Sequence, residues 1–294
     1  ITGATGFLGG YLRDALREAG HEVVAWYRTK RSQSPQDTSV QWIQGELGNS
    51  ADAITLVESV DAVIHSGLAR EGQSFVKSPE HPLDYWHRNA TGSLQLLDAA
   101  ANAGVGKFIF ISSGAVHETV LPDRPLDENH PLLPGTLYGA CKASVETLIH
   151  HYGVSGKICC ATIRPTSIYG IAEPVEASKW FPVIRNICSG GNVEATGGSK
   201  SVHARDVAKA ALLLLGQNES IAGQTYNCCD RMISEFEVAT IAKRIKGSDS
   251  VITGQVKKAK HEINTQKIQT LGMQFGGDEL LERTIAQLVL AIDN

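Results

Sequence analysis

The sequence lacks several features that would assign it to a common class of protein. No stretch reaches the roughly 18 consecutive apolar residues that a membrane-spanning helix needs. Lysine and arginine number 27 against 31 aspartates and glutamates, so the formal net charge is −4 and nothing favours nucleic acid or an acidic membrane surface. There is no Gly-x-Ser-x-Gly motif, no internal repeat and no low-complexity segment. We therefore expect a small-molecule substrate and no nucleic-acid or membrane partner.

A metal-binding pattern is also missing. The ten histidines are scattered, and the adjacent His150 and His151 point to different faces of a helix. None of the six cysteines has metal-ligand spacing, and two adjacent pairs lie in apolar, strand-like runs. We expect no metal site. We interpret the cysteines as buried thiols in a reducing compartment rather than as disulfides, which predicts a cytoplasmic protein.

The most informative pattern is present in the first ten residues, Ile-Thr-Gly-Ala-Thr-Gly-Phe-Leu-Gly-Gly. Gly3, Gly6 and Gly9 separate an apolar residue typical of a strand end from a helical pattern over 11–19. A strand that turns on glycines into a helix directs backbone N–H groups and the positive end of the helix dipole at one point, which favours a pyrophosphate. An ordinary tight turn is the alternative. Because a first strand normally carries more apolar residues, we expect further chain before Ile1.

Strand and helix patterns alternate along the following residues. Strand-like runs cover 21–27, 40–44, 61–65, 107–111 and 157–163, and helical patterns cover 50–59, 83–103 and 138–152. This alternation predicts an α/β protein with a Rossmann-type doubly wound parallel sheet. Beyond Pro165 the pattern loosens, and we expect a smaller, mixed C-terminal region. The predicted dinucleotide-binding domain is 1–168 with 203–230 returning to it, and the predicted substrate-binding region is 169–202 and 231–294.

Residues with distinctive chemistry fall at the C-terminal ends of these strands, the edge at which doubly wound sheets bind ligands. At the tip of the second strand, an acidic residue suits a ribose 2′-OH and a basic one suits a 2′-phosphate. Here the tip carries Tyr27, Arg28, Lys30 and Arg31 and no carboxylate. This predicts an NAD(P) cofactor with NADP slightly favoured over NAD; a solvated basic turn is the alternative.

A possible acid–base group lies further along the chain. Tyr138 and Lys142 are four residues apart on a predicted helix and so share one face. Ser113 ends a central strand. A tyrosine with its ordinary pKa near 10 is a poor base, and a neighbouring ammonium or an oxidised nicotinamide favours its phenolate. With a serine to orient the substrate oxygen, such a set moves a proton to or from a carbonyl or carbinol. A surface pair is the alternative.

Three motifs occur here together: Thr2-Gly-Ala-Thr-Gly-Phe-Leu-Gly9, Ser112-Ser113 and Tyr138-Gly-Ala-Cys-Lys142. They resemble the motifs of the extended short-chain dehydrogenase/reductase superfamily, the NAD(P)-dependent sugar epimerases, dehydratases and related reductases. Further stretches are similar to its adenine-contact, ribose, helix and nicotinamide motifs: Gly45-Glu46-Leu47, Val63-Ile-His-Ser-Gly67, Asn89-Ala-Thr-Gly92 and Arg164-Pro-Thr-Ser-Ile-Tyr-Gly170. The resemblance covers nearly the whole chain.

The resemblance implies a catalytic set of Ser113, Tyr138 and Lys142. In it, Tyr138 is the acid/base, and Lys142 binds the ribose hydroxyls and lowers the tyrosine pKa. It also implies a homodimer formed through the helices around 84–103 and 138–152. The cofactor-binding residues that it implies are Gly3, Thr5, Gly6, Phe7, Leu8, Gly9, Arg28, Glu46, Leu47, Gly67, Tyr138, Lys142, Pro165 and Ser167.

The chain departs from the family pattern in three places. Gly114-Ala115 follow Ser113 where the sugar 4,6-dehydratases carry Asp-Glu, which argues against that dehydration. His117 and Glu118 replace a usual Tyr-Gly; they are either substrate-contacting or ordinary loop residues. The segment 197–203 lacks the Arg-Asp-Phe stretch whose arginine binds a nucleotide phosphate, and Lys200 is the candidate replacement.

The sequence therefore favours an NAD(P)-dependent oxidoreductase or epimerase that acts on a secondary alcohol or ketone, with sugars and nucleotide sugars as candidate substrates. A dihydroflavonol-reductase-like, NADP-dependent reductase of a non-sugar ketone is the alternative within the same group. A non-catalytic NAD(P)-binding sensor is the alternative from a different class.

Overall fold

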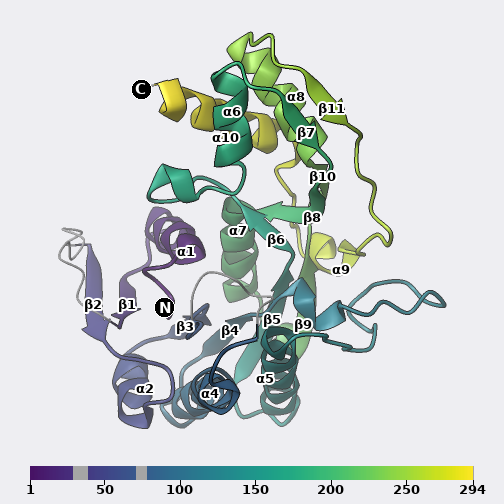
Figure 1. Ribbon diagram of the computed structural model, residues 1–294. Helices are drawn as coiled ribbons and strands as arrows, with labels where there is room; N and C mark the ends of the chain where they lie inside the picture. Colours follow the sequence, from purple (N-terminus) through teal and green to yellow (C-terminus); the bar gives the residue numbers. More distant parts are fainter. Residues whose placement is uncertain (29–38, 71–77, 294) are drawn as a thin grey trace. The chain divides into compact units, whose positions relative to one another are not determined.

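The computed structural model describes residues 1–28, 39–70 and 78–293, which form two compact units (Figure 1). Unit 1 comprises Ile1–Pro165, Ala208–Cys228 and Asn264–Met273. Unit 2 comprises Thr166–Val207, Cys229–Ile263 and the chain from Gln274 onward. The predicted Lys30 and Arg31 of the cofactor site lie outside the described residues.

Unit 1 is built on a sheet of parallel strands. Residues Ile1 and Thr2 lie between β1 and β3, because the Trp26 N–H donates to the Ile1 carbonyl at 3.0 Å and the Thr2 N–H donates to the Ile64 carbonyl at 3.1 Å. All strand pairs of this sheet are parallel. The order is β2 (Val40–Gln44), β1 (Val23–Tyr27), residues 1–2, β3 (Ala62–His65), β4 (Lys107–Ile111), β5 (Cys159–Pro165) and β9 (Gln224–Cys228). This order confirms the predicted doubly wound fold.

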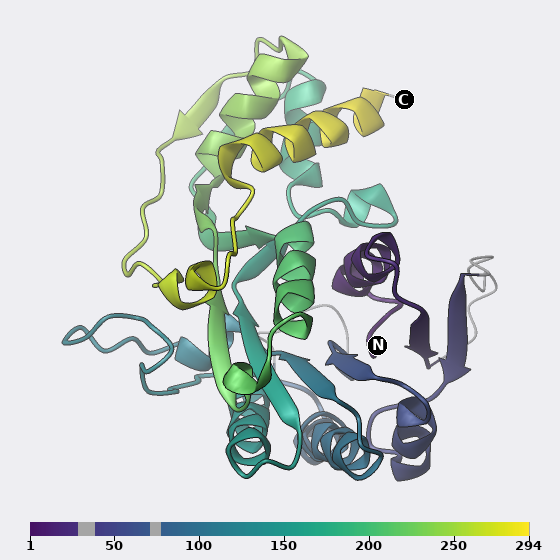
Figure 2. The ribbon, with the colours of Figure 1, turned by 180° about the vertical axis from the view of Figure 1, so that it is seen from behind.

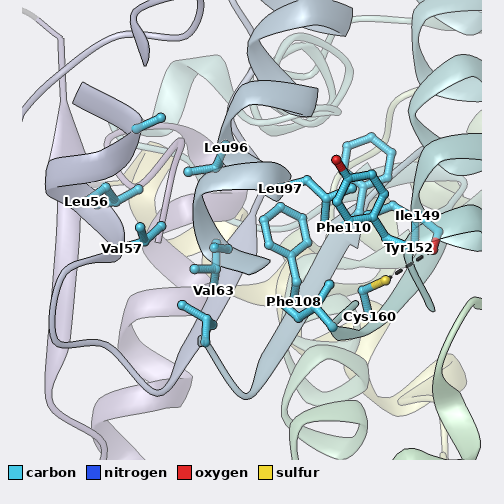
Figure 3. Close-up of a cluster of buried hydrophobic side chains, with 14 of the residues drawn as sticks. Leu56, Val57, Val63, Leu96, Leu97, Phe108, Phe110, Ile149, Tyr152 and Cys160 are labelled. Atoms are coloured by element: carbon cyan, nitrogen blue, oxygen red, sulfur yellow. Dashed lines mark hydrogen bonds between the residues drawn. The ribbon is translucent and has the colours of Figure 1, made fainter. Parts of the chain in front are cut away.

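Helices cover both faces of this sheet (Figures 1 and 2). On one face, apolar side chains of three helices pack on β3 and β4 to form the core shown in Figure 3, which includes Leu56, Leu97, Phe108 and Ile149. Helix α1 and the part of α7 from Ala208 lie on the other face. The bounds are α1 (Phe7–Glu18), α2 (Ser50–Val57), α4 (Gly92–Asn102), α5 (Leu137–Val154) and α7 (Ala204–Leu215).

The single helix predicted over 83–103 is interrupted. Helix α3 (Pro82–Trp86) leads into a π-helical turn, His87–Thr91, before α4 begins at Gly92. A Cβ at Gly92 would lie 2.5 Å from the Gly48 backbone nitrogen, so α4 starts in direct contact with the loop after β2. Turns of this wider kind concentrate at functional sites. No helix in the described residues is both long and apolar enough to cross a membrane.

Residues 264–273 belong to unit 1, whereas the sequence pattern places them in the second region. They carry α9 (Gln266–Thr270), which packs along β9. The Asn264 N–H donates to the Leu126 carbonyl at 2.9 Å, and the Asn227 side-chain amide donates to the Asn264 carbonyl at 3.0 Å. The Lys267 ammonium lies 4.9 Å from the centre of the Tyr226 ring. These contacts depend on residues distant in sequence, and no local pattern reveals them.

Unit 2 combines small sheets with three helices. Its apolar core includes Tyr169, Trp180, Ile184, Ile233 and Leu288. Helix α8 (Glu235–Lys246) is capped at its N-terminus by Ser234, whose hydroxyl accepts a hydrogen bond from the Glu237 N–H at 3.1 Å. One sheet contains β6 (Ser167–Tyr169), β8 (Gly198–His203) and β10 (Arg231–Ser234); the other contains β7 (Val193–Ala195) and β11 (Ile252–Gly254); the helices are α6 (Phe181–Cys188), α8 (Glu235–Lys246) and α10 (Gly277–Asp293).

The first prediction concerns Gly9, where α1 passes closest to the strand end. A Cβ at Gly9 would lie 2.1 Å from the Gly3 carbonyl oxygen, whereas a Cβ at Gly10 would meet only the flexible end of Arg13 at 3.8 Å. We expect Gly9→Ala to lower the free energy of unfolding by about 3 kcal/mol, because backbone must move. We expect Gly10→Ala to raise it by up to about 1 kcal/mol through helix propensity. Urea unfolding followed by circular dichroism measures both, and equal stabilities of the two variants would contradict the packing.

Candidate active site

The glycine turn at the start of the chain leaves the N-terminus of α1 open. Gly3 has a φ of 69°, which a glycine adopts without strain. Among the described residues, no side chain caps α1 and no acidic residue lies in its first turn. A Cβ at Gly6 would meet only the Gly3 carbonyl oxygen, at 3.3 Å, a much smaller overlap than the 2.1 Å that a Cβ at Gly9 would make with the same oxygen. An uncapped helix N-terminus with a bare backbone beside it fits a pyrophosphate.

The other residues predicted for this turn lie at the open N-terminus of α1. Thr5 and Phe7 are exposed, Leu8 is half-buried, and Gly9 is buried under the turn. The Phe7 ring packs edge-on against Tyr11, with the two ring centres 5.6 Å apart.

A pocket of about 410 Å³ lies at the tips of β1 and β2. It is lined by Arg28, Gln44, Gly45, Glu46 and Asp52. The Glu46 N–H donates to the Asp52 carboxylate at 2.9 Å, which orders the chain after β2. The pocket thus brings the predicted Arg28 and Glu46 together, and among the described residues its lining carries two carboxylates and one guanidinium.

A buried chain of hydrogen bonds joins the glycine turn to the end of β3. The Gly67 N–H donates to the Thr2 hydroxyl at 3.0 Å, and Thr2 Oγ1 lies 2.7 Å from His65 Nδ1. His65 Nε2 lies 2.8 Å from the Ser93 hydroxyl, which itself donates to the Asn89 carbonyl. Since Ser93 uses its hydrogen on Asn89, His65 donates from Nε2 and accepts from Thr2 at Nδ1. Burial lowers the pKa of His65 to about 3, and the charge of Lys142 acts in the same direction, so the ring is neutral.

Asn89 also holds the loop after β3. Its side-chain oxygen accepts from the Ala69 N–H at 2.8 Å, and its side-chain nitrogen donates to the Ala69 carbonyl at 2.7 Å. The next residue is Arg70, whose charge lowers the pKa of Tyr138. The sequence analysis does not identify Arg70 as a site residue. The one indirect indication in the sequence is the Asn-x-x-Gly motif, because its Asn89 holds the backbone of Ala69, next to Arg70.

Ser113 and Tyr138 are hydrogen-bonded to each other. The Ser113 oxygen also accepts a hydrogen bond from the Ala115 N–H at 3.1 Å. Burial raises the pKa of Tyr138 above its usual value near 10, while the Ser113 hydrogen bond and the Arg70 charge lower it. The phenol is therefore protonated at neutral pH. The predicted serine–tyrosine pair is formed in the structure.

Lys142 is buried next to this pair. Its ammonium donates to the Ile111 carbonyl at 2.7 Å and lies 4.6 Å from the centre of the Phe110 ring. Burial lowers the pKa of Lys142 to about 8, against the opposing charge of Glu146. The charge that lowers the tyrosine pKa here comes from Arg70, whereas the resemblance assigned this effect to Lys142.

His117 and Glu118 take structural positions. His117 Nε2 lies 3.1 Å from the Arg164 guanidinium, and its Nδ1 lies 3.2 Å from the Pro131 carbonyl oxygen. Arg164 forms a buried ion pair with Glu146 at 2.7 Å. The Glu118 carboxylate accepts from the Gly135 N–H at 3.0 Å. These contacts hold the loop after Ser113 against α5 and β5. They favour the interpretation of His117 and Glu118 as ordinary loop residues over the interpretation as substrate contacts.

All but one of the described site residues predicted from the sequence belong to unit 1. Leu47 and Gly67 are neighbours, since a Cβ at Gly67 would lie 3.4 Å from the Leu47 side chain. Pro165 is the last residue of β5. Ser167 belongs to unit 2, where its hydroxyl accepts a hydrogen bond from Lys179 at 2.8 Å. In the described part of the chain, no cluster of three histidine, cysteine, aspartate or glutamate side chains is arranged to hold a metal ion.

The model of the NAD dependent epimerase/dehydratase family matches residues 1–229. The chain belongs to this family. The match confirms the resemblance to the extended short-chain dehydrogenases/reductases and makes the protein an enzyme of the epimerase, dehydratase and dehydrogenase group.

Relatives in the family carry several activities. The chain is 25% identical over 299 residues to a UDP-glucose 4-epimerase of Corynebacterium glutamicum, covering 90% of this chain and 88% of the relative. It is 28% identical over 210 residues to a 3-beta-hydroxysteroid dehydrogenase of Mycolicibacterium neoaurum, covering 69% and 55%. In fold it is similar to the UDP-glucose-4-epimerase of Stenotrophomonas maltophila with bound NAD and formylated UDP-arabinopyranose (TM-score 0.80, 22% identity, covering 99% and 97%).

The second prediction concerns the neutral His65. An unfolded histidine binds a proton below about pH 6.5, whereas folded His65 does so only near pH 3. Acidification through this window therefore favours the unfolded state, by up to about 1.4 kcal/mol per pH unit. We expect His65→Asn to be less stable than the wild type at pH 8 and to lose less stability between pH 7 and pH 5. Urea unfolding at each pH measures this, and His203, whose pKa burial lowers to about 4, contributes equally to both proteins. Parallel pH profiles would contradict the assignment.

Proposed function

We propose that the protein interconverts a secondary alcohol and a ketone on a sugar or nucleotide sugar, using NAD(P) and Tyr138 as acid/base. The observation that carries the proposal is the hydrogen-bonded Ser113–Tyr138 pair in the unit that also contains the open glycine turn. Its support from relatives is that the UDP-glucose 4-epimerase of Corynebacterium glutamicum matches along 90% of the chain.

Each of the site residues has a separate role in the proposed reaction. A bound nicotinamide supplies the hydride acceptor and donor. Tyr138, protonated at neutral pH, donates a proton to a carbonyl oxygen; in the reverse direction it accepts one, helped by the Ser113 hydrogen bond and the Arg70 charge. Ser113 orients the substrate oxygen. Lys142 has a pKa of about 8 and is therefore mostly charged at pH 7, and it binds the ribose hydroxyls.

Cofactor binding involves the residues of the turn and the strand tips in unit 1. The α1 N-terminus holds the pyrophosphate, and Glu46 and Leu47 contact the adenosine. Arg28 and the absence of a carboxylate at the tip of β1 favour NADP. Glu46 and Asp52, in the same pocket, oppose a 2′-phosphate, and the epimerase of Stenotrophomonas maltophila was solved with NAD. We therefore propose NAD(P), with Arg28 as the residue that sets the preference.

Two other functions are candidates for this protein. The first is a reaction on a different substrate, and the second is cofactor binding without catalysis. A dihydroflavonol-reductase-like reduction of a non-sugar ketone is favoured by the missing Arg-Asp-Phe stretch and by the match to a 3-beta-hydroxysteroid dehydrogenase. A non-catalytic sensor is disfavoured because the serine and tyrosine are already hydrogen-bonded.

We further propose that unit 2 binds the substrate and that Ser167 contacts the nicotinamide end. We also propose that the protein is a cytoplasmic homodimer formed through the helices around 84–103 and 138–152.

The third prediction tests the acid/base role. We expect Tyr138→Phe to reduce turnover by about 100-fold or more while the affinity for the cofactor stays within about 3-fold, because only the proton carrier is removed. Tyr152→Phe, on the same helix, is the control, since its hydroxyl donates to Asp98 at 2.8 Å. The assays are nicotinamide absorbance for net oxidation or reduction and conversion of UDP-glucose to UDP-galactose for epimerisation. A Tyr138→Phe variant that keeps a tenth of the wild-type rate would refute the role.

A further inference from the structure

A long loop joins the two members of the serine–tyrosine pair. It follows Ser113 and the short 3-10 turn η2 (Gly114–His117), and it ends where α5 begins, one residue before Tyr138. Between residues 118 and 136, all of which the structure describes, His130 is one of only two buried side chains. The relative position of the serine and the tyrosine therefore depends on the few points at which this loop is held.

Two histidine rings meet at one carbonyl group of this loop. His117 Nδ1 lies 3.2 Å from the Pro131 carbonyl oxygen, and His130 Nδ1 lies 2.9 Å from the same oxygen. Both rings are buried, and they lie edge to face with their centres 5.2 Å apart. His117 belongs to the turn that leaves Ser113, whereas His130 and Pro131 belong to the part of the loop that returns to Tyr138. The shared carbonyl thus connects the two parts of the loop.

The donors opposite these rings determine which ring nitrogen carries the hydrogen. Arg164 lies 3.1 Å from His117 Nε2, and this nitrogen accepts because a guanidinium has only donors. His130 Nε2 accepts from the Leu121 N–H at 3.0 Å. Each neutral ring therefore has its hydrogen on Nδ1 and donates it to the Pro131 oxygen. His117, His130 and the Pro131 carbonyl together form a histidine clamp.

The clamp is compatible only with neutral rings. A second hydrogen on either ring would be placed on Nε2, which already faces a donor. At His117 it would also bring a positive charge next to the Arg164 guanidinium, and two charged rings at this separation would repel each other. A histidine in water takes up a proton near pH 6.5. Acidification therefore favours a state in which the rings have left Pro131, by up to about 10-fold per ring and per pH unit.

Charged side chains of two helices, one strand and the loop itself lie around the clamp: Arg164, Glu146, Lys267, Asp123, Asp127 and Glu128. The Glu146 carboxylate binds the guanidinium at 2.7 Å, and Asp123, whose charge reaches His130, pairs with Arg124 at 2.8 Å. The Asp127 carboxylate accepts from the Asn129 N–H at 2.9 Å, and the Glu128 carboxylate accepts from the Asn227 N–H at 2.8 Å. Each of these four carboxylates thus accepts a hydrogen bond from a donor other than the two rings.

Backbone contacts connect the clamp to the reacting groups. The Leu133 N–H, two residues after the clamped carbonyl, donates to the Val116 carbonyl at 2.9 Å. A Cβ at Gly139 would lie 2.5 Å from the Ala115 carbonyl oxygen, so η2 packs directly on the first turn of α5. Release of the clamp therefore loosens the contacts that hold the serine next to the tyrosine.

We propose that His117 and His130 are positioning residues that make the site sensitive to pH. In their neutral form they hold the loop that aligns Ser113 with Tyr138, and on protonation they release it. This inference concerns the regulation of the proposed function and rests on it. The rings have no role in the proton transfer. Acid should therefore reduce turnover even in the direction of carbonyl reduction, for which Tyr138 must be protonated.

The fourth prediction is tested by amide hydrogen exchange of the full chain at pH 7.5 and pH 5, corrected for the intrinsic pH dependence of exchange. The amides of β4 report global stability, and their change is subtracted from that of the loop. We expect the protection of the amides from 114 to 136 to fall by about 10-fold or more at pH 5, because the two hydrogen bonds to the Pro131 oxygen are lost together.

The double variant His117→Asn/His130→Asn removes both titratable rings and leaves side-chain amides that can donate to the same carbonyl. We expect its loop protection to change by less than about 3-fold between the two pH values. His151→Asn is the matched control, since His151 is exposed on α5, and it should lose protection as the wild type does. Turnover in the direction of carbonyl reduction should fall together with loop protection in the wild type and in the control.

If the double variant does not fold, nitrogen NMR of the wild-type rings replaces it, and both rings should carry their hydrogen on Nδ1 at pH 7.5. The proposal is overturned if either ring carries it on Nε2, if acid leaves the loop protection of the wild type unchanged, or if the double variant loses protection as the wild type does. Loss of loop protection without loss of turnover also overturns it. Exchange and NMR need no substrate, so failure of the clamp is distinguishable from failure of the Tyr138 assay.

Discussion

The rest of unit 1 depends on one steric constraint, the approach of α1 to the end of the first strand. A side chain at Gly9 would collide with the carbonyl of Gly3, so the helix can lie this close only because position 9 is glycine, whereas a Cβ at Gly3 would collide with the Ser66 backbone at 2.8 Å. The contact fixes the direction of the helix and therefore the point at which its first N–H groups meet. Gly6 is different, because a Cβ there would meet only the Gly3 carbonyl oxygen, at 3.3 Å, and because it is the N-cap of α1, where we propose that the pyrophosphate binds. Packing and the proposed binding thus place separate demands on glycines that look alike in sequence.

Networks of buried hydrogen bonds and one buried ion pair hold the ends of β3 and β5. The chain from Gly67 through Thr2, His65 and Ser93 to Asn89 connects two strands and a helix, and its direction keeps His65 neutral. The same Asn89 fixes the backbone next to Arg70, whose charge acts on Tyr138. The ion pair of Arg164 and Glu146 orders the loop that follows Ser113. Because unpaired polar groups are costly in a low dielectric, such networks set the positions of the residues that remain for chemistry.

Features with a local cause were predictable from the sequence. The apolar runs at 40–44 and 107–111 coincide with β2 and β4, and the Tyr138–Lys142 spacing places both residues on α5. Features with a distant cause were not. The hydrogen-bond partners of Lys179 lie 12, 20 and 22 residues away, on strands of three and six residues. Strands this short do not show a recognisable alternation of apolar and polar side chains. For His117 the sequence left a substrate contact and an ordinary loop residue open, and its contact with the buried Arg164 favours the loop residue.

The central claim is that the open N-terminus of α1 binds the pyrophosphate of a nicotinamide cofactor. Calorimetric titration of Gly6→Ala and Gly10→Ala with NAD and NADP tests it most directly, because Gly6 is the N-cap of α1, next to the proposed pyrophosphate position, whereas a methyl group at Gly10 meets only Arg13. The account predicts that Gly6→Ala remains folded but lowers the affinity for the preferred cofactor by about 10-fold or more, and that Gly10→Ala binds like the wild type. Equal cofactor affinities of the two variants would contradict it.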